Sequence, residues 1–238
     1  MPEHPRAPAS AQIHLRPTAE LAPRVLLPGD PARALVLAQS LLDEPRMFNH
    51  HRGLWGYTGA ASDGEPLTIQ ATGMGGPSAA IVLHELIALG VRRAIRVGTC
   101  GALEPSLTLG QLVIAREAIC RDGTSRALGC GARVGADTAL TRALIAAAPG
   151  ARAGAVASVD LFYDERDPQV PQEPDALAIE MEAAALFAVG ARAGIAVACV
   201  LAVTDTFDER GARTRIDDHA LLAAAERMGA AATTALLA

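Results

Sequence analysis

Short apolar runs alternate along this chain with helix-like stretches, and that alternation constrains the fold more than any other feature. Strand-like runs cover residues 25–27, 67–71, 94–97, 112–116, 154–159 and 197–203. Helical patterns cover residues 32–42, 79–89, 139–148, 183–193 and 218–237. Because strands and helices alternate, the sequence predicts an α/β protein whose sheet is covered by helices on both faces.

The length of the chain suits a single domain. Its 238 residues show neither a composition break wide enough for a linker nor an internal repeat. Residues 1–12 are rich in proline, alanine and charge, which predicts a flexible N-terminal arm. We therefore expect one globular domain over residues 13–238.

The charged residues limit the partners of the protein. The net charge of −5 leaves no basic face for nucleic acid, so no nucleic-acid partner is expected. The chain contains no lysine, and every basic side chain other than histidine is arginine. A lysine Schiff base and a P-loop lysine are therefore excluded, and any phosphate must be bound by arginine, backbone N–H groups or hydroxyls.

The cysteines and the N-terminus indicate a cytoplasmic protein. The four cysteines form no C-x-x-C pair, so we expect free, buried thiols and no metal site. The N-terminus lacks the apolar core of a signal peptide. We also expect no apolar run of membrane-spanning length and no membrane partner.

Glycine-rich polar clusters follow three of the predicted strands. They cover residues 29–33, 73–76 and 96–99. At the carboxyl ends of strands such glycines let backbone N–H groups approach an anion, although each cluster alone is more typical of a turn. Arg96 is unusual because it lies within an apolar strand. It is either a structural ion pair with an acid or a bidentate ligand of an anion.

Two carboxylates stand out in the apolar, small-residue stretch around Glu180-Met181-Glu182. In an extended segment Glu180 and Glu182 point the same way and Met181 points opposite. The carboxylates could bind the vicinal hydroxyls of a sugar, and methionine offers it an apolar surface. The alternative is a helix N-terminus at which acids complement the dipole, and this would explain Glu182 better than Glu180.

Asp205 follows the apolar strand 197–203. At a strand's carboxyl end a partly desolvated aspartate could act as a general acid. An N-cap or turn aspartate is the common alternative, and a lone aspartate is assigned to it.

Taken together, six stretches of the chain resemble the nucleoside phosphorylase family of hexameric bacterial purine nucleoside phosphorylases and uridine phosphorylases. The resemblance runs from about His14 to the C-terminus and is closest to the purine enzymes. It implies one α/β domain with a twisted, mixed central sheet. The stretches are LLPGDPARA, HHRGLWGYTG, TGMGGPSAAI, RVGTCGAL, EMEAAALF and VTD.

The resemblance also implies a set of site residues. Phosphate would be bound by Gly29, Arg33, Arg96 and Thr99, with Arg52 from a neighbouring subunit. Ribose would be bound by Met74, Glu180, Met181 and Glu182, with His14 from the neighbour. The base would lie against Cys100, Gly101 and Phe162.

The implied reaction is phosphorolysis of a nucleoside, with inorganic phosphate as co-substrate and no cofactor. Phosphate attacks an oxocarbenium-like ribosyl, and protonated Asp205 donates to N7 of the leaving purine. The alternatives are a uridine phosphorylase, a related nucleosidase that uses water, and a nucleoside-binding homologue without activity. The expected assembly is a homo-oligomer, a hexamer built as a trimer of dimers.

The chain departs from the family pattern near the base. The purine enzymes have an arginine after the aspartate that assists proton donation, and Arg210, Arg213 and Arg215 are all possible equivalents. The segments after Phe162 and after Ala127 look shortened. The preferred base is therefore left open.

Overall fold

The computed structural model describes residues 12–163, 175–208 and 210–237, so all but the last residue of the predicted N-terminal arm lies outside the described residues. The helices are α1 (Pro31–Leu41), α2 (Gly76–Leu89), α3 (Gly123–Ala127), α4 (Thr138–Ala147), α5 (Ala183–Ala193) and α6 (Asp218–Leu237), with a 3₁₀ turn η2 (His51–Gly53). The strands are β1 (Arg24–Leu27), β2 (Asp43–Asn49), β3 (Gly56–Ala60), β4 (Pro66–Gln70), β5 (Arg93–Ala102), β6 (Leu112–Cys120), β7 (Arg133–Gly135), β8 (Arg152–Ser158), β9 (Ala176–Glu180), β10 (Ala196–Phe207) and β11 (Arg213–Arg215).

These strands form one mixed sheet, which confirms the predicted fold class. The order is β11-β10-β6-β8-β9-β5-β1-β4-β3-β2, and β7 pairs with β6. The central pairings β1–β4, β1–β5 and β5–β10 are parallel. Since β10 also pairs with β5, the strands β5, β10, β6, β8 and β9 close into a ring. Half of the sheet is thus a small barrel.

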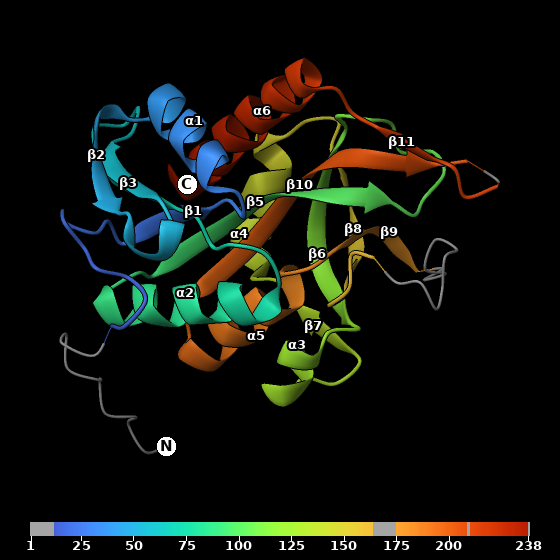
Figure 1. The fold of residues 1–238 in the computed structure, drawn as a ribbon, viewed down its shortest axis with the longest axis horizontal. Helices are drawn as coiled ribbons and strands as arrows, with labels where there is room; N and C mark the ends of the chain where they lie inside the picture. The colour runs from blue at the N-terminus through green and yellow to red at the C-terminus, as the bar shows by residue number, and fades with distance from the viewer. Residues whose placement is uncertain (1–11, 164–174, 209, 238) are drawn as a thin grey trace.

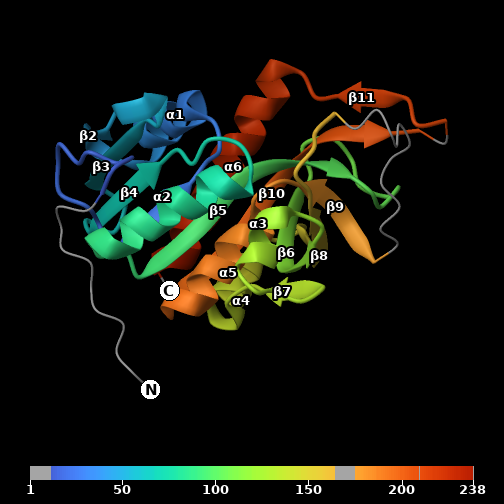
Figure 2. The same cartoon turned by 60° about the horizontal axis from the view of Figure 1, so that its bottom comes forward.

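Helices cover both faces of the sheet, as expected. Buried residues of α2 and α5 pack in one core cluster with β1, β6 and β10, and those of α1, α4 and α6 pack in a second cluster on the opposite face. Figures 1 and 2 show α1 and α6 on one side of β5 and β10, with α2 and α5 on the other. Ala94 and Ile95 illustrate the alternation, because these neighbours in β5 belong to different clusters.

The final helix corrects one sequence expectation. The 20-residue helix α6 contains an 18-residue window with a mean hydropathy of 1.2, so by length and composition it could cross a membrane. Half of it is buried inside the protein, where Ala224, Met228 and Leu236 belong to the core. Its apolar character is therefore explained by packing against the sheet and against α1 and α4.

The two strands that carry the site are longer than predicted. The sequence places a turn at residues 98–101, but β5 continues to Ala102. The strand predicted over residues 197–203 ends at Val203, but the observed strand β10 continues to Phe207, with a register shift between Val203 and Asp205. Glycines and polar residues in these strands resemble turns locally, and strand pairing overrides that tendency. The stretch 121–136, which looks irregular in sequence, contains α3 and β7.

Candidate active site

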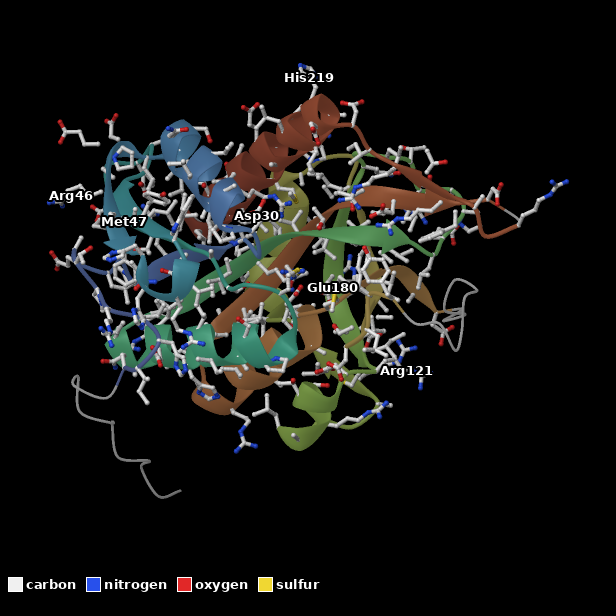
Figure 3. The ribbon with its side chains drawn as sticks, in the orientation of Figure 1. Asp30, Arg46, Met47, Arg121, Glu180 and His219 are labelled. Atoms are coloured by element: carbon white, nitrogen blue, oxygen red, sulfur yellow. The ribbon has the colours of Figure 1, made fainter. Side chains whose placement is uncertain are left out.

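A cavity of about 660 Å³ opens where β1, β5, β9 and β10 end. Figure 3 shows Asp30, just after β1, and Glu180, at the end of β9, near the middle of the molecule, whereas Arg46 and Met47 of β2 lie at its edge. His14 and Arg52 are not among the lining residues. The predicted residues that line the cavity are Gly29, Arg33, Met74, Arg96, Thr99, Cys100, Gly101, Phe162, Glu180, Met181, Glu182 and Asp205.

The guanidinium of Arg96 is buried between two carboxylates. Its Nε lies 3.0 Å from Oε2 of Glu180, and its Nη2 pairs with Oε2 of Glu182. Burial lowers the pKa of Arg96, but Glu182 and Glu180 raise it more, so the net shift is upward and the charge is retained. Nη1 donates no hydrogen bond to a described residue, so Arg96 forms a structural ion pair with one nitrogen left for a ligand.

Gly98 explains how such a large side chain fits inside a strand. Arg96 and Gly98 lie two residues apart on β5, so their side-chain positions face the same way. A Cβ on Gly98 would lie 2.7 Å from Cζ and Nη2 of Arg96. The guanidinium therefore lies flat against the Gly98 backbone.

Glu180 is a structural carboxylate. Its Oε2 accepts hydrogen bonds from the backbone N–H groups of Glu182 and Ala183, both at 2.9 Å, and its Oε1 accepts one from Ser158 Oγ. It thereby caps α5, whereas the N-cap residue Glu182 makes no side-chain cap bond. The sequence left open whether the acids mark a helix N-terminus, an interpretation that would explain Glu182 better than Glu180; Glu182 does occupy the N-cap position, but the capping hydrogen bonds are accepted by Glu180. Burial raises the pKa of Glu180 and Arg96 opposes that shift.

Glu182 is the more accessible of the two carboxylates, because 7% of its side chain is exposed and none of that of Glu180. Besides pairing with Arg96, it accepts a hydrogen bond of 2.5 Å on Oε1 from the backbone N–H of Gly75. Gly75 adopts a φ of 86°, which favours glycine, and it begins α2. Met181 also lines the cavity, and Met74 lies at its rim, 85% exposed. Both carboxylates contact Arg96, so they point the same way, as the sequence predicted.

Arg33 brings a second cation to the same end of the cavity. It lies in the first turn of α1, where Asp30 caps the helix by accepting from the Ala32 N–H at 2.9 Å. Burial lowers the pKa of Arg33; the charge of Asp30 opposes this shift, and the smaller effect of Arg96 adds to it. No described residue forms an ion pair with Arg33. Two guanidiniums, the Gly29 backbone and the hydroxyl of Thr99 thus surround space suited to an anion.

Asp205 also lines the cavity, buried within β10 opposite Gly101, which lies five residues beyond Arg96 along β5. Its Oδ1 accepts from Arg213 Nε at 2.7 Å and from Arg215 Nη1 at 3.2 Å, and Thr204 Oγ1 lies 2.8 Å from Oδ2. The β10–β11 hairpin explains both contacts, because it pairs Asp205 directly with Arg215. Arg210 makes no side-chain contact with Asp205, so Arg213 and Arg215 are the two arginines that could assist it.

The wall beside Asp205 is apolar and aromatic. Phe162 is 54% exposed, and the Arg213 guanidinium lies 4.8 Å from the centre of its ring. Sequence reasoning missed Phe207, which also lines the cavity and would lie 3.3 Å from a Cβ on Gly101. Phe207 shares a face with Asp205 through the period of a strand, so recognising the full length of β10 would have found it.

The described residues hold no candidate metal centre. Within residues 12–163, 175–208 and 210–237, no group of three histidines, cysteines or acids could hold a metal ion. All four cysteines are free thiols. Burial raises the pKa of Cys100 and Cys199, which keeps both protonated beside Arg96.

Comparison with known proteins identifies the family. The model of the phosphorylase superfamily matches residues 23–238. The chain belongs to the phosphorylase superfamily. It is 37% identical over 196 residues to a DeoD-type purine nucleoside phosphorylase of Oceanobacillus iheyensis, a match that covers 78% of this chain and 83% of the relative. It is 38% identical over 205 residues to one of Alkaliphilus metalliredigens, covering 82% and 87%.

A third relative, the DeoD-type purine nucleoside phosphorylase of Geobacillus kaustophilus, is 37% identical over 196 residues, covering 79% of this chain and 83% of the relative. The family match begins just before β1 and includes every cavity residue described above. The structural core and the cavity therefore belong to the shared family domain.

Proposed function

We propose that the protein is a purine nucleoside phosphorylase, which cleaves the N-glycosidic bond of purine ribonucleosides and deoxyribonucleosides reversibly with inorganic phosphate. The observation that carries the proposal is one cavity lined both by two arginines suited to an anion, Arg33 and Arg96, and by a buried carboxylate, Asp205. Glu182, which pairs with Arg96, lines the same cavity and could bind a sugar there. The names of the relatives support the same activity.

Phosphate would bind at the end formed by Arg33, Arg96 and Thr99. Arg33 is partly buried and lacks an acidic partner among the described residues, so an anion would stabilise its charge. A related nucleosidase that uses water would need no such site. The paired cations therefore favour phosphorolysis over hydrolysis.

Ribose would bind in the middle of the cavity. The Glu182 carboxylate would accept hydrogen bonds from the 2′- and 3′-hydroxyls, and Met181 and Met74 would contact the sugar. Glu182 also pairs with Arg96, so one guanidinium links the sugar-binding carboxylate to the phosphate. Both reactants would thus be oriented by a single rigid group.

The base would lie between Phe162, Phe207, Cys100 and Gly101, with N7 toward Asp205. A proton given by Asp205 to N7 neutralises the charge that develops on the leaving purine. The contacts of Asp205 with Arg213 and Arg215 are those that would stabilise the carboxylate after the proton has left. A pyrimidine has no N7, so this arrangement favours purines over uridine.

We also infer the co-substrate, the cellular compartment and the assembly of the enzyme. Inorganic phosphate is a co-substrate, and no cofactor is used. The free cysteines suit a reducing cytoplasm. We infer a homo-oligomer, built as a hexamer of three dimers, in which His14 and Arg52 complete the cavity of a neighbouring protomer.

The test measures release of free base from inosine, adenosine and uridine, with and without phosphate. We expect release from the purine nucleosides only, and only with phosphate. Asp205→Asn should slow release at least a hundredfold, as for loss of a general acid, whereas the exposed control Asp218→Asn should not. Release without phosphate, turnover of uridine alone, or tight nucleoside binding without turnover would each support one of the alternatives.

A further inference from the structure

Two residues assigned to the nucleoside site, His14 and Arg52, do not line the cavity of their own chain. They lie with Arg16, His50 and His51 in a group of basic side chains, here called the edge cluster. Figure 1 shows the segment after residue 12 and the β2–β3 region, which carry this cluster, away from β9 and β11. If His14 and Arg52 contact substrate, they must do so in another copy.

Glu85 of α2 fixes the position of His14. Its carboxylate accepts hydrogen bonds from the backbone N–H groups of Ile13, His14 and Leu15, at 3.1, 3.1 and 2.7 Å. It also lies 2.7 Å from Nδ1 of His14. An acceptor at Nδ1 places the ring proton there, so Nε2 is the nitrogen left for a ligand.

Asn49 joins the segment of His14 to the loop of Arg52. Its side chain is fully buried. Oδ1 accepts from the backbone N–H of Arg16 at 2.9 Å, and Nδ2 donates to the carbonyl of Leu54 at 2.6 Å. One amide therefore fixes the distance between the two segments.

The loop of Arg52 needs such support. Arg52 has a φ of 59°, a left-handed conformation that is unfavourable for arginine. The Leu54 carbonyl that Asn49 binds also accepts from Gln70 Nε2 at 2.9 Å. Two buried amides thus maintain a backbone conformation that arginine would not adopt on its own.

The edge cluster has the charge to meet an anion. Partial desolvation and the positive charges of Arg16 and Arg52, with smaller contributions from the neighbouring His50 and His14, lower the pKa of His51. Arg16, His50 and Arg52 are exposed. An anion bound in a second copy would relieve the repulsion between these side chains.

We propose that Asn49 and Glu85 are positioning residues that hold His14 and Arg52 as a preformed pair for the cavity of a second copy of this chain. Arg52 meets the phosphate there, and His14 Nε2 meets the 5′-hydroxyl of the sugar. The inference rests on the proposed phosphorylase activity. Because the pair is fixed before the copies meet, no ordering cost is added when they assemble.

Double-mutant cycles test whether the two residues act through the pair. Asn49→Ala and Glu85→Gln should each lower kcat/KM roughly ten- to hundredfold, the effect of misplacing a contact group by about 1 Å. In a protein that already carries His14→Ala, the further change Glu85→Gln should lower kcat/KM only a little. The same should hold for Asn49→Ala added to Arg52→Ala. Additive losses would overturn the proposal, and the exposed Arg46→Ala should keep wild-type kcat/KM.

Co-expression separates a positioning role from damage to the fold. Asn49→Ala protomers retain an intact cavity, and Asp205→Asn protomers retain an intact edge cluster. In random pairs of the two, about a quarter of all cavities would be complete, so roughly a quarter of wild-type activity should return. Absence of recovery in assembled, folded protein would overturn the proposal. The same experiment with Glu85→Gln covers the case in which Asn49→Ala does not fold.

The wild-type assay separates a failure of the proposed phosphorylase activity from a failure of the roles of Asn49 and Glu85. If wild-type protein does not cleave nucleosides with phosphate, the proposed function fails. If it does, but the cycles are additive or the mixed assemblies stay inactive, only the roles of Asn49 and Glu85 fail.

Discussion

Glu180→Gln tests the role of the buried carboxylate that anchors the site. Glu180 accepts from four donors: Arg96 Nε, Ser158 Oγ and the backbone N–H groups of Glu182 and Ala183. Glutamine has nearly the same shape but only one acceptor oxygen, so its NH₂ group must face at least one of these donors. The variant therefore loses hydrogen bonds without leaving a cavity.

The expected loss follows from the type of bond. A hydrogen bond to a charged group contributes about 1.5–3 kcal/mol, and Arg96 keeps its second partner Glu182. Removing the cost of burying a carboxylate offsets part of the loss. We expect the free energy of unfolding to fall by about 2–3 kcal/mol, which lowers Tm by roughly 4–12 °C for a chain of this size.

The assay is thermal unfolding at pH 8, followed by circular dichroism, beside steady-state kinetics in phosphate. Glu117→Gln is the matched control, because Glu117 pairs with Arg133 at 2.7 Å in an exposed ion pair worth about 0–1 kcal/mol. With Arg96 less well held, KM for phosphate should rise about tenfold. A Tm within 2 °C of wild type would refute the reasoning that Glu180 anchors Arg96 and α5.

Three further outcomes follow from the same contacts. Gly98→Ala places a Cβ 2.7 Å from Arg96 Cζ, which must displace the guanidinium. KM for phosphate should therefore rise about tenfold in steady-state kinetics. An unchanged KM would contradict the contact between Gly98 and Arg96. Arg213→Gln should lower kcat about tenfold, and Arg215→Gln should lower it less. Arg213 is 34% exposed and its Nε lies 2.7 Å from Asp205 Oδ1, whereas Arg215 is 60% exposed and its Nη1 lies 3.2 Å from the same oxygen. Equal effects on kcat would argue against a larger role for Arg213. Burial raises the pKa of Glu85, but its hydrogen bonds lower it more, so the net shift is downward. The Glu85 carboxylate therefore stabilises the fold at pH values above its unfolded pKa of about 4.5. The Tm difference between wild type and Glu85→Gln should be present at pH 6 and shrink as the pH falls below about 4.5; a constant difference would count against the assignment.

Much of the fold can be predicted from local patterns. The helix predicted over residues 183–193 and the final helix over 218–237 match α5 and α6. Apolar periodicity and capping residues act within a few residues of the chain, so they are legible in sequence. The cores of β1, β6 and β8 were found for the same reason. The hairpin of β2 and β3 was missed, since the β2 sequence, DEPRMFN, lacks an apolar strand pattern.

The sequence predicted most of the residues that line the cavity, though not Phe207, and it did not predict their contacts with one another. Family-like motifs identified Arg96, Glu180, Glu182 and Asp205, and the structure brings all four to one cavity. Sequence reasoning could not say which glutamate caps α5. It could not choose among the arginines after Asp205, because that choice depends on the register of a hairpin with no strong sequence pattern.

The sequence by itself determined the α/β class, the order of most elements and the residue types available for an anion, a sugar and a base. Only the tertiary structure decided how they meet. Arg96 and Glu180 are 84 residues apart, and their ion pair exists because β5 and β9 close the ring of strands. Local propensities act over a few neighbours, whereas such contacts depend on strand register and on the balance between burying a charge and pairing it.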